Sequence, residues 1–259
     1  MKTVLFEEDA RGIATVTLNR PEKRNAMSGE MIKELAEVAA RAASSDTIRA
    51  LIMKAEGPAF CAGGDLGWMR DQMAADDDQR RQEATNLAEM LKSFNALPVP
   101  VIASVHGNAF GGGVGLMSVC DIVFAAEGTR FGLTETRLGL IPATIGPYVV
   151  ARMGAAKARR VFFSSRIFDA QEAAELGLVS RVVAADDLEA EVEAEAVGYL
   201  DCAPGAVAAA KKLIFDIEAA SESDKTLLTV EALVERWQTA EADEGTSAFF
   251  EKRPPNWKT

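Results

Sequence analysis

The sequence predicts an α/β core of stacked strand–helix units, followed by a C-terminal third that is mostly helical. Short apolar runs at residues 50–54, 99–105 and 121–126 are typical of buried strands. Helical patterns separate these runs, which favours a layered α/β architecture. From Ile145 onward the apolar spacing is mainly that of amphipathic helices. A chain of 259 residues suits one sizeable domain, or one domain with an appendage.

The N-terminal half alternates predicted strands and helices. Residues 4–6 and 13–18 are predicted to form two paired strands, joined by a turn at residues 9–12. Ser28 is a suitable N-cap for an apolar-striped helix ending near Ala43. Residues 73–81 are polar and include three consecutive aspartates, so we expect a mobile segment or a frayed helix start. Strands at 99–105 and 121–126, and a short extended piece at 130–132, complete this half.

The C-terminal third is predicted as helices interrupted by one strand at 178–183. The amphipathic stretches are residues 184–200, 204–217 and 227–239. The tail, residues 249–257, is aromatic, basic and stopped by prolines. We therefore expect a core over residues 1–200 and a C-terminal helical region over residues 201–259.

Composition excludes several classes of protein. A net charge of −11 argues against a nucleic-acid-binding surface. Three cysteines and one histidine make a zinc site improbable and indicate reduced thiols, so no metal site is predicted. No apolar run approaches the roughly 20 residues of a membrane span, and the N-terminus has no signal-peptide core. We expect a cytoplasmic protein with no nucleic-acid or membrane partner.

Common catalytic motifs are missing as well. The sequence has no GxSxG nucleophile elbow and no GxxxxGK[ST] phosphate loop. The glycines at 111–115 do not fit GxGxxG and lie mid-chain, unlike a dinucleotide-binding turn. His106 directly precedes the glycine turn. It is interpreted as a structural residue at a strand end, with a general base as the alternative.

Two glycine-rich turns are the most informative feature. Five glycines fall within residues 107–115, and a second turn spans residues 60–65. Glycine permits positive φ and lets a ligand approach bare backbone. Free N–H groups at such turns can stabilise a developing oxyanion. Two turns of this kind can aim two donors at one oxygen.

The same residues belong to a longer series of motifs, in which the chain resembles the crotonase, or enoyl-CoA hydratase/isomerase, superfamily. The resemblance covers nearly the whole chain, and the order of its motifs is more specific than any one of them. They lie at residues 18–26, 59–66, 98–103, 107–113, 120–122, 131–135, 139–142, 173–179 and 251–253. The resemblance implies a crotonase-like spiral of ββα units with a C-terminal helical trimerisation region.

The resemblance also implies site residues. The backbone N–H groups of Gly64 and Gly112 match the family's oxyanion hole for a thioester carbonyl, and Glu135 matches a catalytic glutamate. No cofactor is implied, because coenzyme A is part of the acyl-CoA substrate. Lys252 is either a surface lysine or a contact to the CoA of a neighbouring subunit. Further positions matched to substrate binding are Arg24, Ala62, Asp65, Leu66, Gly115, Pro142 and Ala143.

The sequence departs from the hydratase pattern at Gly115, where the family places a first glutamate. With only Glu135 left, three outcomes are open: Glu135 does both proton transfers of hydration, the enzyme isomerises a double bond, or activity is lost to a silent acyl-CoA-binding protein. The loss of a charge and of several atoms at Gly115 predicts more room and less repulsion for an acyl carboxylate. Arg70 or Arg137 is a candidate partner for it.

Local sequence around residues 65–70, 110–116 and 137–145 resembles a subgroup that hydrates branched, carboxylated enoyl-CoAs of the methylglutaconyl-CoA type. The expected function is therefore an enoyl-CoA hydratase of fatty-acid or branched-chain amino-acid metabolism. Isomerase and silent-protein alternatives remain open. The resemblance implies a homotrimer or a homohexamer.

Overall fold

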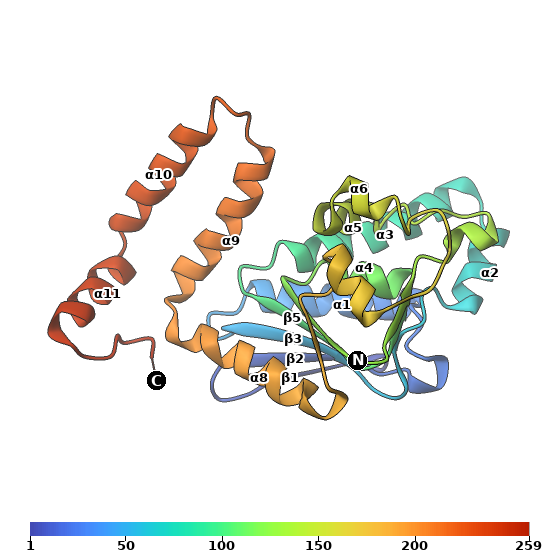
Figure 1. Ribbon diagram of the computed structural model, residues 1–259, viewed down its shortest axis with the longest axis horizontal. Coiled ribbons are helices and arrows are strands. Elements are labelled where there is room, and N and C mark those ends of the chain that lie inside the picture. Colours follow the sequence, from blue (N-terminus) through green and yellow to red (C-terminus); the bar gives the residue numbers. More distant parts are fainter. Residues whose placement is uncertain (259) are drawn as a thin grey trace.

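The computed structural model describes residues 1–258, and a six-stranded sheet forms the body of the molecule (Figure 1). β1 and β2 pair antiparallel, whereas the later neighbours are parallel. These strands confirm the predicted hairpin and buried runs, although the last strand begins at Arg181 and not at Leu178. The spatial order is β1 (Val4–Glu8), β2 (Ile13–Leu18), β3 (Ala50–Ala55), β5 (Val101–Val105), β7 (Ile122–Ala126) and β10 (Arg181–Val183).

Both faces of this sheet are covered, which explains why its central strands are continuously apolar. In β3, Leu51 and Met53 belong to the core on the face covered by α1 (Gly29–Ala43) and α3 (Asp77–Asn95). The alternate residue Ile52 belongs to a second core, which α8 (Leu188–Gly198) covers from the other side (Figure 1).

The predicted first helix is confirmed, and a helix also starts within residues 73–81, where the sequence predicted a mobile segment or a frayed helix start. α2 (Leu66–Ala74) ends there and α3 begins at Asp77. The Asp76 carboxylate accepts the N–H of Gln79 at 2.9 Å as an N-cap. Acidic side chains in a first turn also complement the helix dipole. The aspartate run is therefore a helix-start signal.

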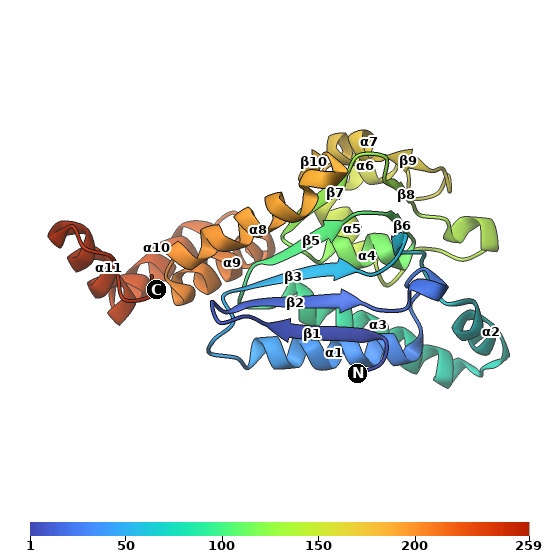
Figure 2. The same cartoon turned by 90° about the horizontal axis from the view of Figure 1, so that it is seen from below.

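A second sheet of four short strands lies at the end of the molecule toward which β2 and β3 point (Figure 2). Sequence patterns indicated only residues 130–132, because two or three residues are too few to show a period. The order is β4 (Ala59–Cys61), β6 (Asn108–Phe110), β8 (Arg130–Gly132) and β9 (Phe168–Asp169). The first three strands of this sheet run parallel.

The remaining helical elements connect the sheets and close the core. The short helices are α4 (Gly112–Ser118), α5 (Gly146–Met153), α6 (Ala155–Ala158) and α7 (Ala170–Leu176). The 3-10 turns are η1 (Pro21–Lys23), η2 (Glu135–Leu138), η3 (Ala185–Asp187) and η4 (Tyr199–Asp201). The helix predicted over 184–200 is thus α8 flanked by two 3-10 turns.

Residues 204–258, here called the C-terminal arm, project from the body at the end opposite to α2 (Figures 1 and 2). The arm contains α9 (Pro204–Ala219), α10 (Lys225–Trp237) and α11 (Ala240–Glu251), the last of which was not predicted. Lys211 binds Asp121 of the core, with Nζ 2.6 Å from Oδ2. Arg49 donates to the carbonyls of Cys202 and Trp257. These contacts attach the arm to the sheet.

Candidate functional site

Three neighbouring strands of the second sheet end beside one another and carry the predicted site residues. β4, β6 and β8 are adjacent and parallel, so their carboxyl ends meet at one edge. β4 leads into Gly64, β6 leads into Gly112, and β8 leads into Glu135. The short β6 therefore places the glycine turn in register with the other two segments.

Gly112 is the first residue of α4, and the turn before it requires glycine. Gly111 has φ 48° and ψ −113°, a conformation that side chains rarely adopt. Within the described chain the Gly112 N–H has no hydrogen-bond acceptor, as expected for the first N–H of a helix. The donor is therefore available to a ligand.

Gly64 lies in a turn that is held against the segment around Met27. The N–H of Met27 donates to the Gly63 carbonyl at 2.8 Å, and the N–H of Asp65 donates to the Met27 carbonyl at 2.9 Å. In such a parallel bridge the N–H of Gly64 faces away from Met27. That side is occupied by β6 and Gly112, and the Gly63 carbonyl carbon lies 4.0 Å from where a Cβ on Gly112 would stand. No residue in 1–258 accepts the Gly64 N–H.

Glu135 begins η2 and faces the turn before Gly112. Its Oε1 is 3.0 Å from the position that a Cβ would take on Gly111. Its Oε2 is buried and, among the described residues, has no hydrogen-bond partner. Burial raises the pKa of this carboxyl above its usual range, opposed only by a hydrogen bond from its own N–H. A buried, unpaired carboxyl is costly for folding, which indicates a functional role.

The residues matched to substrate binding around Gly64 are also close together. The Arg24 carbonyl accepts the N–H of Ala62 at 2.9 Å, and the Arg24 side chain is exposed. Asp65 caps α2 and pairs with Arg20, with Oδ2 3.0 Å from the guanidinium. Burial disfavours the charged Asp65, but the N–H of Trp68, the Arg20 guanidinium and a second backbone N–H outweigh it and lower its pKa. Leu66 follows, 82% exposed.

Three other predicted residues lie elsewhere in the chain. Pro142 is buried and Ala143 is exposed, both in the loop that follows Glu135 and η2. Lys252 is exposed at the end of α11, and α11 lies at the opposite end of the molecule from α2 (Figure 2). Within one chain the fold therefore does not bring Lys252 to Gly64 and Gly112.

The expectation of additional room at Gly115 is wrong. Gly115 is buried in α4, and the side chain of Ile145 occupies the space into which a side chain at position 115 would extend. Ile145 itself is 3% exposed. The atoms absent from Gly115 are thus replaced by an isoleucine from the loop before α5. A single sequence gives no sign that Ile145 fills this space.

Two further residues were missed, Trp68 and Met69 of α2. The Met69 side chain is 3.4 Å and the Trp68 ring 3.9 Å from the Cβ position of Gly64. They lie in a stretch that was noted only as a subgroup resemblance, and no chemical pattern distinguished them. His106 lies at the end of β5, where its Nε2 is 2.7 Å from the Gly57 carbonyl. This contact favours the structural interpretation of His106.

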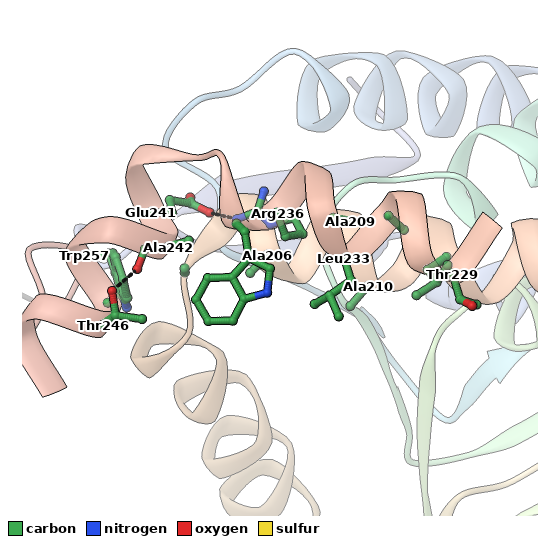
Figure 3. Close-up of a pocket in the computed structure, with 15 residues that line it drawn as sticks. Ala206, Ala209, Ala210, Thr229, Leu233, Arg236, Glu241, Ala242, Thr246 and Trp257 are labelled. Carbon is green, nitrogen blue, oxygen red and sulfur yellow. Dashed lines mark hydrogen bonds and ion pairs between the residues drawn. The ribbon is translucent and has the colours of Figure 1, made fainter. Parts of the chain in front are cut away.

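A groove of about 490 Å³ lies in the C-terminal arm, away from the glycine turns (Figure 3). Alanines line much of it together with Leu233, Trp237 and Trp257, and its Arg236 and Glu241 pair with each other at 2.6 Å. It contains none of the predicted site residues. In residues 1–258 no cluster of metal-ligating side chains occurs, and no helix has both the length and the apolarity to span a membrane.

The family model described as enoyl-CoA hydratase/isomerase matches residues 8–259. The chain belongs to the enoyl-CoA hydratase/isomerase family. A protein named probable enoyl-CoA hydratase from Mycobacterium bovis is 35% identical over 257 residues, covering 99% of this chain and 98% of the relative.

Solved structures agree with the predicted crotonase-type α/β fold. The crystal structure of an enoyl-CoA hydratase from Shewanella pealeana superposes with a TM-score of 0.94 at 36% identity, covering 98% of this chain and 96% of the other. AtuE from Pseudomonas aeruginosa has a TM-score of 0.94 at 39% identity, covering 99% and 100%. Enzymes of this family act on acyl-CoA thioesters, and the match to these relatives covers 96–100% of their length.

Proposed function

We propose that this member of the family hydrates enoyl-CoA thioesters, with Glu135 as its acid and base. The observation that carries the proposal is the buried Oε2 of Glu135, which has no hydrogen-bond partner within residues 1–258 and lies next to the turn that exposes the Gly112 N–H. A carboxyl with a raised pKa beside free donors suits proton transfer at a thioester.

In the proposed reaction the N–H groups of Gly64 and Gly112 hold the thioester carbonyl oxygen. Glu135 takes a proton from water as the water oxygen bonds to the β carbon of the enoyl group. The electron pair of the double bond moves onto the thioester, and the enolate oxygen is stabilised by the two N–H groups. Protonated Glu135 then returns its proton to the α carbon. Fixed donors stabilise the charged intermediate more than the neutral substrate, which lowers the barrier.

Mutation of the carboxyl tests this proposal. Glu135→Gln removes the proton carrier and should lower kcat for crotonyl-CoA and 3-methylglutaconyl-CoA by at least 10²-fold. Glu175→Gln, at an exposed position of α7, is the matched control and should retain activity. Wild-type turnover of every enoyl-CoA by Glu135→Gln would remove the assigned role.

Isomerisation of an enoyl-CoA is the second candidate, because it needs one proton shuttle and the site has one carboxyl. The packing of Ile145 at Gly115 favours this alternative, since it leaves no ionisable side chain at that position. Reaction in water labelled with oxygen-18 separates the two: hydration places solvent oxygen in the product, whereas isomerisation moves the double bond without gaining oxygen. Tight acyl-CoA binding without turnover would instead support a silent binding protein.

The proposal extends to substrate class and assembly. A branched or carboxylated acyl group remains the proposed substrate, now on the subgroup resemblance alone. Arg70 and Arg137 are exposed and, within residues 1–258, form no ion pair, so either is available to an acyl carboxylate.

We also propose a homotrimer or homohexamer in which Arg24 and the neighbouring subunit's copy of Lys252 meet the CoA. Large apolar side chains exposed on the arm, including Leu227, Leu233 and Trp237, support this assembly.

A further inference from the structure

The indole of Trp68 lies between the start of α1 and the turn that carries Gly64. Its Cδ1 and Nε1 are 3.6 and 3.8 Å from the Cβ position of Gly29. Its Cε3 is 3.9 Å from the Cβ position of Gly64. Trp68 is half-buried and packs against the main hydrophobic core. One edge of the ring is therefore fixed on the body, and the other edge adjoins a proposed oxyanion donor.

Glu83 of α3 holds this ring in place. The Trp68 Nε1–H donates to the Glu83 Oε2 at 2.9 Å, and the same oxygen is 3.5 Å from the Cβ position of Gly29. An indole has one N–H donor, so this bond selects one orientation of the ring. A charged acceptor makes it stronger than a neutral hydrogen bond. The absence of a side chain on Gly29 leaves the space in which ring and carboxylate meet.

The Trp68–Glu83 contact is one of a few attachments that hold α2 beside Gly64. None of its residues is fully buried, and Leu66 and Met73 are each 82% exposed. Asp65 caps its first turn, and Arg80 donates to the carbonyls at its end. Trp68 and Met69 are the side chains of α2 that reach Gly64.

We propose that Trp68 forms an apolar wall of the acyl pocket beside Gly64, and that Glu83 is the positioning residue that fixes this wall. The inference rests on the proposed function, because a thioester held at Gly64 brings its acyl chain past the indole. The wall limits the length of the acyl chain that can extend beyond the reacting double bond. Its flat apolar surface also suits the planar conjugated system of an enoyl thioester.

A spectroscopic experiment tests the location of the ring without requiring turnover. The chain has three tryptophans, and Trp237 and Trp257 both line the groove of the arm. Trp237→Phe combined with Trp257→Phe therefore leaves Trp68 as the sole emitter. Titration with butyryl-CoA, which has no double bond to hydrate, should change its emission saturably and more than titration with CoA does.

If the double variant folds poorly, butyryl-CoA is titrated into the unaltered chain and into Trp68→Phe instead. The difference between their emission changes is then the response of Trp68. Binding of butyryl-CoA measured by calorimetry without any acyl-dependent change in Trp68 emission would overturn the proposal.

Kinetic selectivity tests the wall itself. Trp68→Ala should raise the ratio of kcat/KM for trans-2-decenoyl-CoA over crotonyl-CoA at least tenfold, the scale on which apolar pockets discriminate chain length. Glu83→Ala should shift the ratio in the same direction by a smaller factor, and Glu83→Gln, which retains an acceptor oxygen, should restore it. Glu89→Ala on the exposed side of α3 is the matched control.

A purely structural role would lower stability without moving the ratio. An unchanged ratio in folded Trp68→Ala would therefore sink the proposal. If no enoyl-CoA is hydrated but Trp68 emission still responds to the acyl chain, the proposed hydratase activity is wrong, whereas the position of Trp68 at the acyl pocket is supported.

Discussion

The side chain of Ile145 packs directly against Gly115, with its Cβ 2.8 Å from the point where a Cβ on Gly115 would stand. A real Cβ essentially never approaches a neighbour so closely, so a side chain at position 115 would force Ile145 or α4 to shift. The two residues come from α4 and from the loop that follows Glu135, and both are buried. An apolar side chain therefore fills the space at position 115, where the family resemblance places a glutamate.

This packing predicts the effect of adding a methyl group at Gly115. Gly115→Ala should lower the free energy of unfolding by about 1–3 kcal/mol, because overpacking a buried site forces its neighbours to move. Gly198→Ala is the matched control, since nothing lies within 4 Å of its Cβ position and it ends α8. That change should be neutral or stabilising by up to about 1 kcal/mol. Urea denaturation measures both.

Truncation of Ile145 supplies the second half of this test. Ile145→Gly, which also removes the Cβ that lies 2.8 Å from the Gly115 Cβ position, should by itself destabilise the protein by leaving a cavity. In that background, however, Gly115→Ala should cost much less than in the unaltered chain, which is a coupling between the two positions. Equal costs in both backgrounds would show that the two residues do not compete for one space.

The buried carboxyl of Glu135 predicts a pH-dependent stability. Because burial raises its pKa in the folded state, the folded protein holds this proton more tightly than the unfolded chain, whose pKa is about 4.3. Stability from this group is present below the unfolded pKa and falls as pH rises through the folded pKa. Glu135→Gln should therefore stabilise the protein at pH 7 by on the order of 1 kcal/mol, while reducing activity.

The gain from Glu135→Gln should shrink as pH approaches 4, where the glutamate is protonated in both states. Urea denaturation from pH 4 to 8 checks this, with Glu175→Gln as the exposed control. A gain of the same size at both ends of the range would contradict the assignment of an unpaired buried charge to this site.

The arm predicts that assembly depends on its exposed apolar side chains. Leu233 in α10 is 60% exposed and also lines the groove of the arm. Leu233→Glu places a charge there and should shift the protein from an oligomer toward the single chain, as measured by sedimentation. Thr226→Glu, at an exposed position early in the same helix, should leave the sedimentation unchanged. Single-chain sedimentation of the unaltered protein would contradict the proposed assembly.

Much of the fold was predicted from local sequence patterns, because the periodicity of apolar residues is visible in long strands and amphipathic helices. The helix from Gly29 and the central strands are examples. The strands β4, β6 and β9 were not predicted. Each has only two or three residues, which is too few to show a periodicity, and each pairs with strands distant in sequence. The start of α3 was predicted only as one of two alternatives, because three consecutive aspartates do not show by themselves which of them caps a helix.

Some residues of the candidate site could likewise be predicted from the sequence, and others could not. Glycine turns and a motif glutamate are visible in a single sequence, and the structure brings Gly64, Gly112 and Glu135 to one sheet edge. The exchange of Ile145 for a side chain at Gly115 was invisible, since it couples positions 30 residues apart through space. Nothing in the sequence indicated a role for Trp68, because its ring lies near Gly29 and Gly64 only in the folded chain.

Removal of a backbone donor gives the sharpest test of the proposed oxyanion hole. Gly112 is the first residue of α4, a position where proline is tolerated because that N–H makes no helical hydrogen bond. Gly112→Pro deletes the donor, whereas Gly112→Ala keeps it, and both add a Cβ that meets the flexible end of Met27. If the N–H holds the thioester oxygen, Gly112→Pro should lower kcat for crotonyl-CoA by about 10²–10³-fold relative to Gly112→Ala. Circular dichroism confirms that both variants are folded before the rates are compared. Equal kcat values for the two would mean that this N–H does not stabilise the enolate, and the role would pass to other donors at the same edge.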